Sequence, residues 1–418
     1  MNLLKTSALN GVAVLIKTAT LFILNKILAV YVGPSGYAII GQFQNFIQMI
    51  TTFSGNMINT AVTKYTAEYY EDERRQKNIW QNAGSIICIL SLFFSVLLIV
   101  FQKKLSLYIF NTIEYQTVFI WFAVFLILFN FNTLFLAILN GKKEISKLVL
   151  ANILGSILSL TITSILAIKY HLYGALLALS IYQSIAFFIT FYICYKAEWF
   201  HFSYLFGKLD KDVTKKFASF ALMSIVSALC IPLSQIVIRT YLTQEFGINY
   251  AGYWEAMVRL SSAYLMLITT TLGVYYLPRL SELKSFVEIK SEVYLGYKFI
   301  FPLAIVGGLS VYLLKDWIIV LLFSPKFLPM ADLFVWQMIG DVLKIGSWIL
   351  AYLMLSKAMT RLFVTTEIIF AISSIVLTYL CTQWFGFKGV SIAHLINYAI
   401  YWGVMSVFVF KYLKSKVV

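Results

Sequence analysis

Five basic residues of this 418-residue chain lie inside long apolar segments, where charged side chains are rare. They are Lys17, Lys26, Arg239, Arg259 and Lys344. A lysine or arginine at the centre of a membrane helix costs roughly 2.5–3.5 kcal/mol on insertion scales, so it is expected to face protein, water or ligand rather than lipid. Arginine clamps phosphate with two hydrogen bonds, and lysine binds it as a point charge. We therefore predict that these residues bind an anionic substrate in a cavity.

Two of these cations share one predicted helix. Lys17 lies near the middle of the apolar segment 11–31, and Lys26 lies nearer its outer end. Nine residues of α-helix place them on opposite faces, about 13.5 Å apart along the axis. Both line one cavity only if the helix bends, and Lys26 could instead extend to the outer membrane interface. Arg239 is expected beside the outer mouth of the cavity, together with Lys26.

Three acidic residues also lie inside apolar segments. Glu255 precedes Arg259 by four residues and Asp341 precedes Lys344 by three, spacings at which side chains pair along a helix. Each pair could serve only to neutralise its own charges. Alternatively, a substrate phosphate takes the cation and releases the carboxylate, which couples binding to a change of shape. Glu367 could meet Lys344 across helices or relay a proton.

The segment 36–64 is unusually polar for a membrane helix. Its amide and hydroxyl side chains recur every three or four residues and are expected to form one continuous helical face. Because an amide both donates and accepts hydrogen bonds, this face suits sugar hydroxyls. The same groups could instead bond neighbouring helices. The residues concerned are Gln44, Gln48, Thr52, Asn56 and Asn59.

Composition identifies the elements that must position these groups. The chain is 61% hydrophobic and 12% charged, which is typical of a polytopic α-helical membrane protein. The apolar runs are far longer than the strands of a membrane barrel. Twelve spans are predicted at 7–31, 36–64, 79–101, 116–139, 148–168, 172–195, 217–241, 249–277, 297–314, 330–356, 361–384 and 388–410.

The loops between these spans are short and leave no room for a catalytic domain, so we do not expect an enzyme. No metal-binding, disulfide or phosphate-loop pattern is present, and no cofactor is expected. Most of the 33 lysines and arginines fall in loops on the side of the N-terminus. By the positive-inside rule, both termini are predicted to be cytoplasmic, and the net charge of +15 does not indicate nucleic-acid binding.

An internal repeat divides the chain. Gly36-Tyr37 returns as Gly252-Tyr253, and Gly174 returns as Gly389, at nearly equal offsets. Six spans are an even number, so both halves enter the membrane with the same polarity and are related by an axis along the membrane normal. The predicted organisation is an N-lobe over 1–196, a cytoplasmic linker over 197–216 and a C-lobe over 217–418.

Three segments carry a resemblance to a known family: VTKYTAEYYED at 62–72, YYLPRLSEL at 275–283 and KFLPMADLFVWQMIGDVLKIGSWILAYLMLSKA at 326–358. The chain resembles Wzx-type polysaccharide flippases of the multidrug/oligosaccharidyl-lipid/polysaccharide superfamily. The resemblance implies a MATE-like fold of two six-helix lobes in the bacterial inner membrane, and alternating access. The implied substrate is an undecaprenyl-pyrophosphate-linked oligosaccharide, either the common-antigen unit lipid III or an O-antigen unit. A polysaccharide polymerase and a chain-length regulator are the implied partners.

The sequence leaves two other classes of protein to compare with a flippase. A cation-coupled drug or lipid exporter of the same fold calls for an acidic cavity, whereas the first span carries lysines and no acid. A polysaccharide polymerase or ligase needs a large extracytoplasmic loop for its acceptor, and the outer loops are short. A flippase fits the sequence best.

Overall fold

Helices make up almost all of the chain in this computed structural model. The structure describes residues 3–272, 276, 279–280, 283, 285–357 and 359–416; within these, it does not describe the side chains of 3–10, 219, 223, 267, 271, 410 and 412–416. The α-helices are α1 (Leu3–Tyr31), α2 (Gly33–Ser54), α3 (Asn59–Glu68), α4 (Glu73–Phe110), α5 (Gln116–Gly141), α6 (Ile145–Tyr195), α7 (Lys211–Phe246), α8 (Ile248–Thr271), α10 (Phe286–Leu313), α11 (Lys315–Leu322), α12 (Phe334–Ser356), α13 (Thr360–Phe385) and α14 (Gly389–Lys416). Short 3₁₀ helices join some of them: η1 (Asn56–Ile58), η2 (Phe202–Leu205), η4 (Pro325–Leu333) and η5 (Gly386–Lys388).

Eight segments of the described chain are long and apolar enough to cross a membrane. Some contain two helices: α6 breaks at His171, whose φ of 49° and ψ of −126° are not helical. The segment Thr360–Val409 likewise covers α13 and most of α14. The arrangement is consistent with the twelve predicted spans. Most of the segment 275–283, and the end of the predicted span 249–277, lie outside the described residues.

The predicted span 36–64 is not a single helix, and this prediction was wrong. Helix α2 ends at Ser54, and Gly55 and η1 separate it from α3. Side chains crowd this point, because a Cβ on Gly55 would lie 2.8 Å from Cγ1 of Ile87. Glycine therefore lets α4 approach the break, and the polar face expected to run through it is interrupted.

By internal packing, the chain forms two units. Unit 1 comprises Met1–Val32 and Ile39–Pro232, and unit 2 comprises Gly33–Ala38 and Leu233–Val418. The division within α7 falls at Pro232, which lacks the N–H that continues a helix. The first half of α7 thus packs with unit 1. The lobe boundaries expected from the repeat, with a linker at 197–216, remain a prediction.

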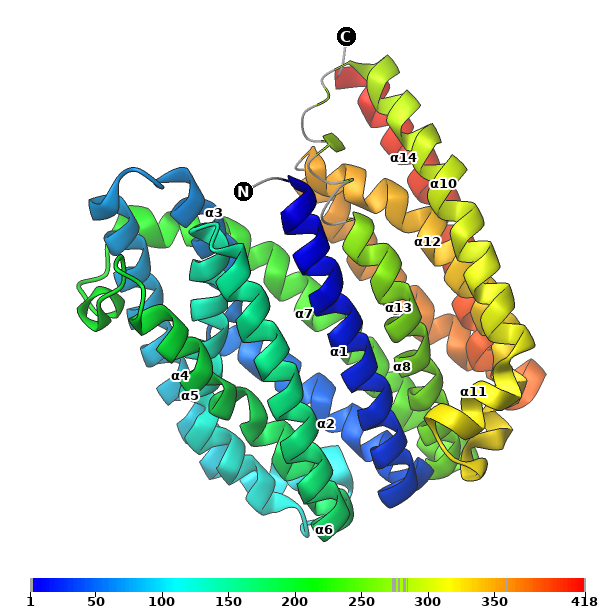
Figure 1. Cartoon of the computed structure of the whole chain (residues 1–418). Coiled ribbons are helices and arrows are strands. Elements are labelled where there is room, and N and C mark those ends of the chain that lie inside the picture. The colour runs from blue at the N-terminus through cyan, green and yellow to red at the C-terminus, as the bar shows by residue number, and fades with distance from the viewer. Residues whose placement is uncertain are drawn as a thin grey trace. The chain divides into compact units, whose positions relative to one another are not determined.

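Within unit 1, α5 packs against α4 and α6, and α1 runs along α6 (Figure 1). Its apolar core includes Trp80, Phe135 and Leu139. A buried hydrogen-bond network links α2, α4 and α5. Nδ2 of Asn130 donates to the hydroxyl groups of Ser54 and Ser91, at 2.8 and 2.9 Å. Interhelical hydrogen bonds of this kind stabilise helix association in a membrane, where the hydrophobic effect does not drive helices together.

Within unit 2, α12 packs against α10 and α14, and α13 packs against α14 (Figure 1). Ile345, Leu350 and Met354 of α12 lie in its core. In both units a glycine permits a sharp return of the chain. A Cβ on Gly174 would lie 1.9 Å from the carbonyl oxygen of Leu166, and one on Gly389 would lie 2.3 Å from that of Cys381, eight residues earlier in each case. The two glycines are the pair that the repeat aligns.

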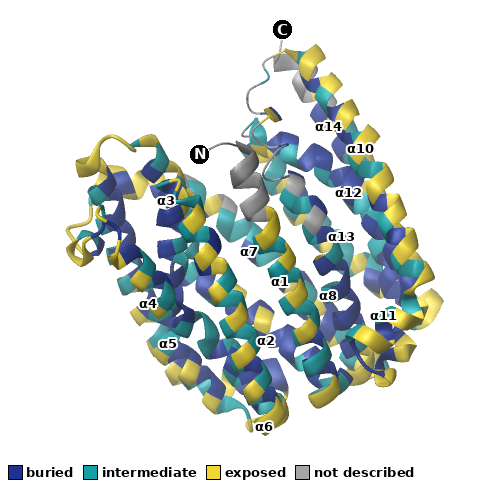
Figure 2. Ribbon diagram, in the orientation of Figure 1, coloured by how far each residue is buried: buried dark blue, intermediate teal, exposed yellow. Residues whose placement is uncertain are grey.

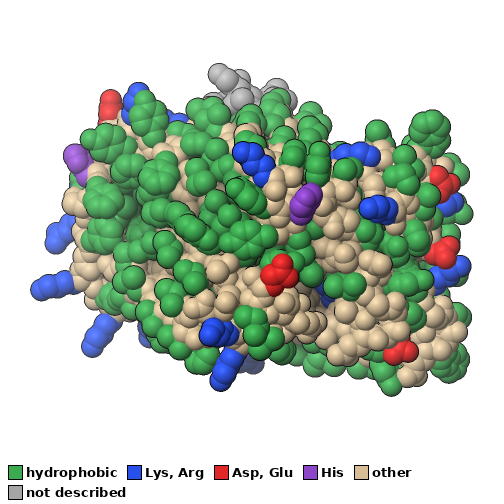
Figure 3. Space-filling model, turned by 90° about the horizontal axis from the view of Figure 1, so that it is seen from below, with side chains coloured by type: hydrophobic (Ala, Val, Ile, Leu, Met, Phe, Trp, Pro, Cys, Tyr) green, Lys and Arg blue, Asp and Glu red, His purple; other side chains and the backbone are tan. Residues whose placement is uncertain are grey.

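Exposed residues lie on the outward faces of the helices (Figure 2). On α4, Leu92, Val96 and Val100 are each about 60% or more exposed, one helical turn apart. Figure 3 likewise shows hydrophobic side chains over much of the face it draws, with charged groups scattered among them. Exposed apolar surface on this scale is expected where lipid replaces water, so the protein is a multi-pass membrane protein.

Candidate functional site

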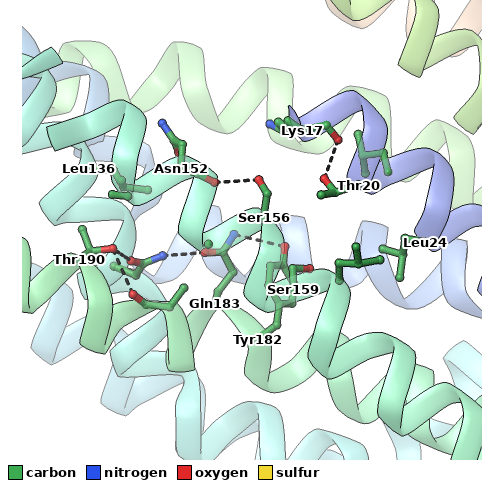
Figure 4. A pocket seen from close by; sticks show the side chains of 16 residues that line it. Lys17, Thr20, Leu24, Leu136, Asn152, Ser156, Ser159, Tyr182, Gln183 and Thr190 are labelled. Atoms are coloured by element: carbon green, nitrogen blue, oxygen red, sulfur yellow. Dashed lines mark hydrogen bonds between the residues drawn. The ribbon is translucent and has the colours of Figure 1, made fainter. Parts of the chain in front are cut away.

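A polar pocket of about 200 Å³ lies inside unit 1, between α1, α5 and both halves of α6. Lys17 extends from α1 toward α6 (Figure 4). Lys17 lines the pocket, and the half-buried Lys26 is not among its lining residues. This agrees with the prediction that the two lysines lie on opposite faces of α1. The polar lining residues are Lys17, Thr20, Asn132, Asn152, Ser156, Ser159, Tyr182, Gln183 and Thr190, and the others are Leu21, Leu24, Leu136, Ala151, Gly155, Leu160 and Ala186.

A chain of side-chain hydrogen bonds forms one wall of this pocket (Figure 4). Thr190 Oγ1 donates to Asn132 Oδ1 at 2.7 Å, and Asn132 Nδ2 donates to Gln183 Oε1 at 2.7 Å. Gln183 Nε2 then donates to the hydroxyl oxygen of Tyr182 at 3.2 Å. The sequence analysis missed these four residues; their polar side chains inside apolar spans were the available signal.

The lining of the pocket carries positive charge. Among the described residues that line it, Lys17 is the only charged one. Within the described part of unit 1, no carboxylate forms an ion pair with Lys17. Lys17 is exposed, so its ammonium group is available to an anion.

The predicted polar face of 36–64 separates into two parts. Gln44 and Gln48 are exposed on α2. Thr52 donates to the carbonyl oxygen of Gln48 at 2.8 Å, while Asn56 and Asn59 bond each other at 3.2 Å. Asn56 also accepts a hydrogen bond from Thr133 of α5. Of these residues, Asn56 bonds a neighbouring helix, which is the alternative role that the sequence left open for this face.

Unit 2 holds a buried cluster of three charges. Glu255 of α8 accepts a hydrogen bond from Arg239 of α7 and a second from Nε of Arg259, the latter at 2.7 Å. The predicted pair of Glu255 and Arg259 is thus confirmed, and Arg239 joins it from another helix. Arg239 is only 2% exposed, and its expected place beside the outer mouth of a cavity stays a prediction. The guanidinium groups of Arg239 and Arg259 lie 5.4 and 5.3 Å from the ring centres of Trp254 and Tyr37. Two cations and one anion leave the cluster with a net positive charge.

Asp341 lies at the centre of a second buried network in unit 2. Its Oδ1 lies 2.9 Å from Nε2 of His394 and accepts from Nε2 of Gln337 at 3.3 Å, and its Oδ2 accepts from the hydroxyl group of Tyr264 at 2.8 Å. His394 lies within the predicted span 388–410, where the sequence assigned it no role. Only the packing of α8, α12 and α14 reveals that these groups meet.

Asp341 has other partners besides the predicted Lys344. Its carboxylate hydrogen-bonds His394, while the charge of Lys344 acts on it without a direct ion pair. The ammonium group of Lys344 instead lies 4.9 and 5.2 Å from the ring centres of Trp348 and Tyr398. Glu367 is half-buried and forms no ion pair with Lys344. Asp341 and Lys344 are three residues apart on α12, and each side chain contacts residues of neighbouring helices.

Outside the spans, Asp210 and Lys142 of unit 1 are among the groups with shifted pKa values. Hydrogen bonds from the Asn78 amide and from the backbone N–H of Asp212 lower the pKa of Asp210. Burial lowers the pKa of Lys142, an effect that Glu73 and Glu144 partly offset. Among the described residues, no three His, Cys, Asp or Glu side chains group closely enough to hold a metal ion.

The fold defines the class of protein. It is similar to the inward-facing conformation of a multidrug resistance MATE family transporter, with a TM-score of 0.78, 14% identity and 96% of each chain covered. It is also similar to the lipid II flippase MurJ in an inward closed conformation, with a TM-score of 0.71, 13% identity, and 97% of this chain and 87% of that chain covered. This is an all-α membrane protein with a MATE-like transporter fold.

The sequence defines the family more narrowly. Residues 3–284 match the family described as "Polysaccharide biosynthesis protein", and the chain belongs to that family. It is 28% identical over 413 residues to the lipid III flippases of Escherichia coli (strain K12) and Shigella flexneri, with 97% of each chain covered.

Proposed function

We propose that this protein is a flippase that moves an undecaprenyl-pyrophosphate-linked oligosaccharide, lipid III or an O-antigen unit, between the leaflets of a membrane. The family membership and the relatives named as lipid III flippases support this substrate class. The MurJ-like fold supports a lipid flippase over an enzyme. The protein is a transporter and is not an enzyme.

The observation that carries the proposal is the cationic character of both units at membrane depth. In unit 1, Lys17 lines a polar pocket without an acidic lining residue. In unit 2, two arginines share the single carboxylate of Glu255. A diphosphate cannot cross hydrocarbon unaided, because its desolvation is prohibitive, whereas cations and hydroxyl groups replace its hydration.

The proposed mechanism is alternating access through a basic central cavity, from the cytoplasmic to the periplasmic leaflet of a bacterial inner membrane, with both termini cytoplasmic. The cations bind the phosphates, and the exposed amides of α2 bind sugar hydroxyls. Glu255, Asp341 and Glu367 couple binding to the change of shape. A polysaccharide polymerase and a chain-length regulator are candidate partners.

Reconstitution tests the function directly. Liposomes that contain only this protein should move a fluorescently labelled undecaprenyl-pyrophosphate glycan between leaflets, detected by dithionite quenching, while protein-free liposomes should not. Export of organic cations without lipid movement would favour the multidrug activity named for the MATE neighbours. Covalently altered glycan recovered from the liposomes would contradict a transporter.

A further inference from the structure

The pocket of unit 1 has a lining suited to one kind of ligand. Its single ionic group is the ammonium of Lys17, and no acidic residue lines it. An organic cation would be repelled by the ammonium group, whereas an anion would be attracted to it. The charge therefore selects an anion.

The neutral groups of the pocket add hydrogen-bond donors to this charge. Hydrogen bonds run from Thr190 through Asn132 to Gln183, and the side-chain N–H of Gln183 donates to the hydroxyl oxygen of Tyr182. Because that oxygen acts as the acceptor, the hydroxyl hydrogen of Tyr182 can donate to another group. In the described part of unit 1, that hydrogen has no acceptor. Together with the Lys17 ammonium, it suits the oxygens of a phosphoryl or carboxylate group.

The size of the pocket limits what enters it. The pocket volume of about 200 Å³ lies below the roughly 300–1,000 Å³ of sites that enclose drug-sized ligands. This space holds one oxyanion with part of its hydration, and it is too small for an oligosaccharide. The remainder of a large ligand must lie outside the pocket.

We propose that this pocket is an oxyanion subsite for the transported molecule, in which Lys17 and Tyr182 bind one phosphoryl or sugar carboxylate group. The identity of that molecule rests on the proposed function. The two sources, the pyrophosphate linker and an acidic sugar, share the chemistry that the pocket recognises. The hydrogen-bonded chain orients Tyr182, so Asn132, Gln183 and Thr190 are positioning residues.

Gly155 offers a way to close the pocket without removing any polar group. It lines the pocket, and a Cβ placed on it would meet only the Cβ of Ala186, at 3.9 Å. Gly155→Ala should therefore be tolerated and serve as the control. Gly155→Leu extends three further carbon atoms into the space and should exclude the anion.

The test measures binding to the full-length protein in lipid nanodiscs, by isothermal titration calorimetry. The probes are inorganic pyrophosphate, glucuronate and neutral N-acetylglucosamine. We expect Lys17→Gln and Gly155→Leu to weaken anion binding about tenfold or more, and Tyr182→Phe to weaken it by about two- to tenfold. Lys17→Arg and Gly155→Ala should retain it. Preference for pyrophosphate identifies the linker as the source of the anion, and preference for glucuronate identifies an acidic sugar.

Equal binding of the neutral sugar, or anion binding that is unchanged in Lys17→Gln and Gly155→Leu, would overturn the subsite. The flipping assay separates this outcome from failure of the proposed function. If the wild type flips the labelled lipid and these two variants flip it at the same rate, the subsite is wrong and the function stands. If the wild type binds anions through Lys17 but flips no lipid, the subsite stands and the function is wrong.

Discussion

The buried charges around Glu255 permit a quantitative prediction for Glu255→Gln. The side chains of Arg239 and Glu255 are 2% and 6% exposed, and Arg259 is 17% exposed. The substitution preserves shape and removes the carboxylate that accepts hydrogen bonds from both guanidinium groups. Removing one partner of a buried ion pair destabilises a protein by about 3–5 kcal/mol, so we expect a loss of that size in the free energy of unfolding.

Equilibrium unfolding in detergent micelles, followed by far-UV circular dichroism, measures this loss. The matched control is Asp332→Asn, which breaks the surface pair with Lys388, where both side chains are more than half exposed. It should cost about 0–1 kcal/mol. Adding Arg239→Met to Glu255→Gln should restore part of the stability, because it removes one of the two like charges beside the substituted position.

Two results would refute this reasoning. One is a loss below about 1 kcal/mol for Glu255→Gln, the size of an ordinary interhelical hydrogen bond in a membrane. The other is a double variant less stable than Glu255→Gln alone. Either would mean that water or lipid phosphate compensates the arginines, and that the cluster is not the closed network that the structure contains.

Three further predictions concern other parts of the molecule. Arg259→Ala should leave the protein inserted but reduce surface polysaccharide about tenfold, measured by immunoblot at equal protein level, because a phosphate-binding cation is lost. Gly252→Ala should destabilise the protein by about 1–3 kcal/mol, because its Cβ would lie 1.8 Å from a carbonyl oxygen at the start of α2, whereas Gly307→Ala meets nothing within 4 Å and should not. The lowered pKa of Asp210 stabilises the folded state above its unfolded value of about 3.9, and this stability is lost as the pH falls through the folded value. Acidification below about pH 4 should therefore release the segment before α7, measured by limited proteolysis, and Asn78→Ala should shift that release to higher pH.

Each of these has a contradicting outcome. Unchanged polysaccharide in Arg259→Ala would remove that residue from the substrate path. Equal unfolding free energies for the two glycine variants would contradict the close approach of α2 and α8. The wild type and Asn78→Ala could release the segment before α7 at the same pH. That result would show that the hydrogen bond from Asn78 does not stabilise the charged form of the Asp210 carboxylate.

The sequence by itself determined the membrane class, the helices and the positions of the charges. A membrane helix closes its own backbone hydrogen bonds, so long apolar segments can be located without knowledge of their neighbours. Pairs one turn apart on one helix, such as Glu255 and Arg259, were predictable for the same reason. The break at Gly55 was not, because it depends on how closely α4 packs there.

Only the tertiary structure decided which polar side chains meet across helices. Arg239 joins Glu255 from α7, and His394 reaches Asp341 from α14, although each is remote from its partner in the sequence. The same holds for the pocket of Lys17, whose lining comes from α1, α5 and α6. Contacts between helices depend on the rotation and depth of each helix in its bundle. A hydrophobic pattern leaves those variables open, because in lipid the apolar surface does not distinguish a neighbouring helix from the hydrocarbon.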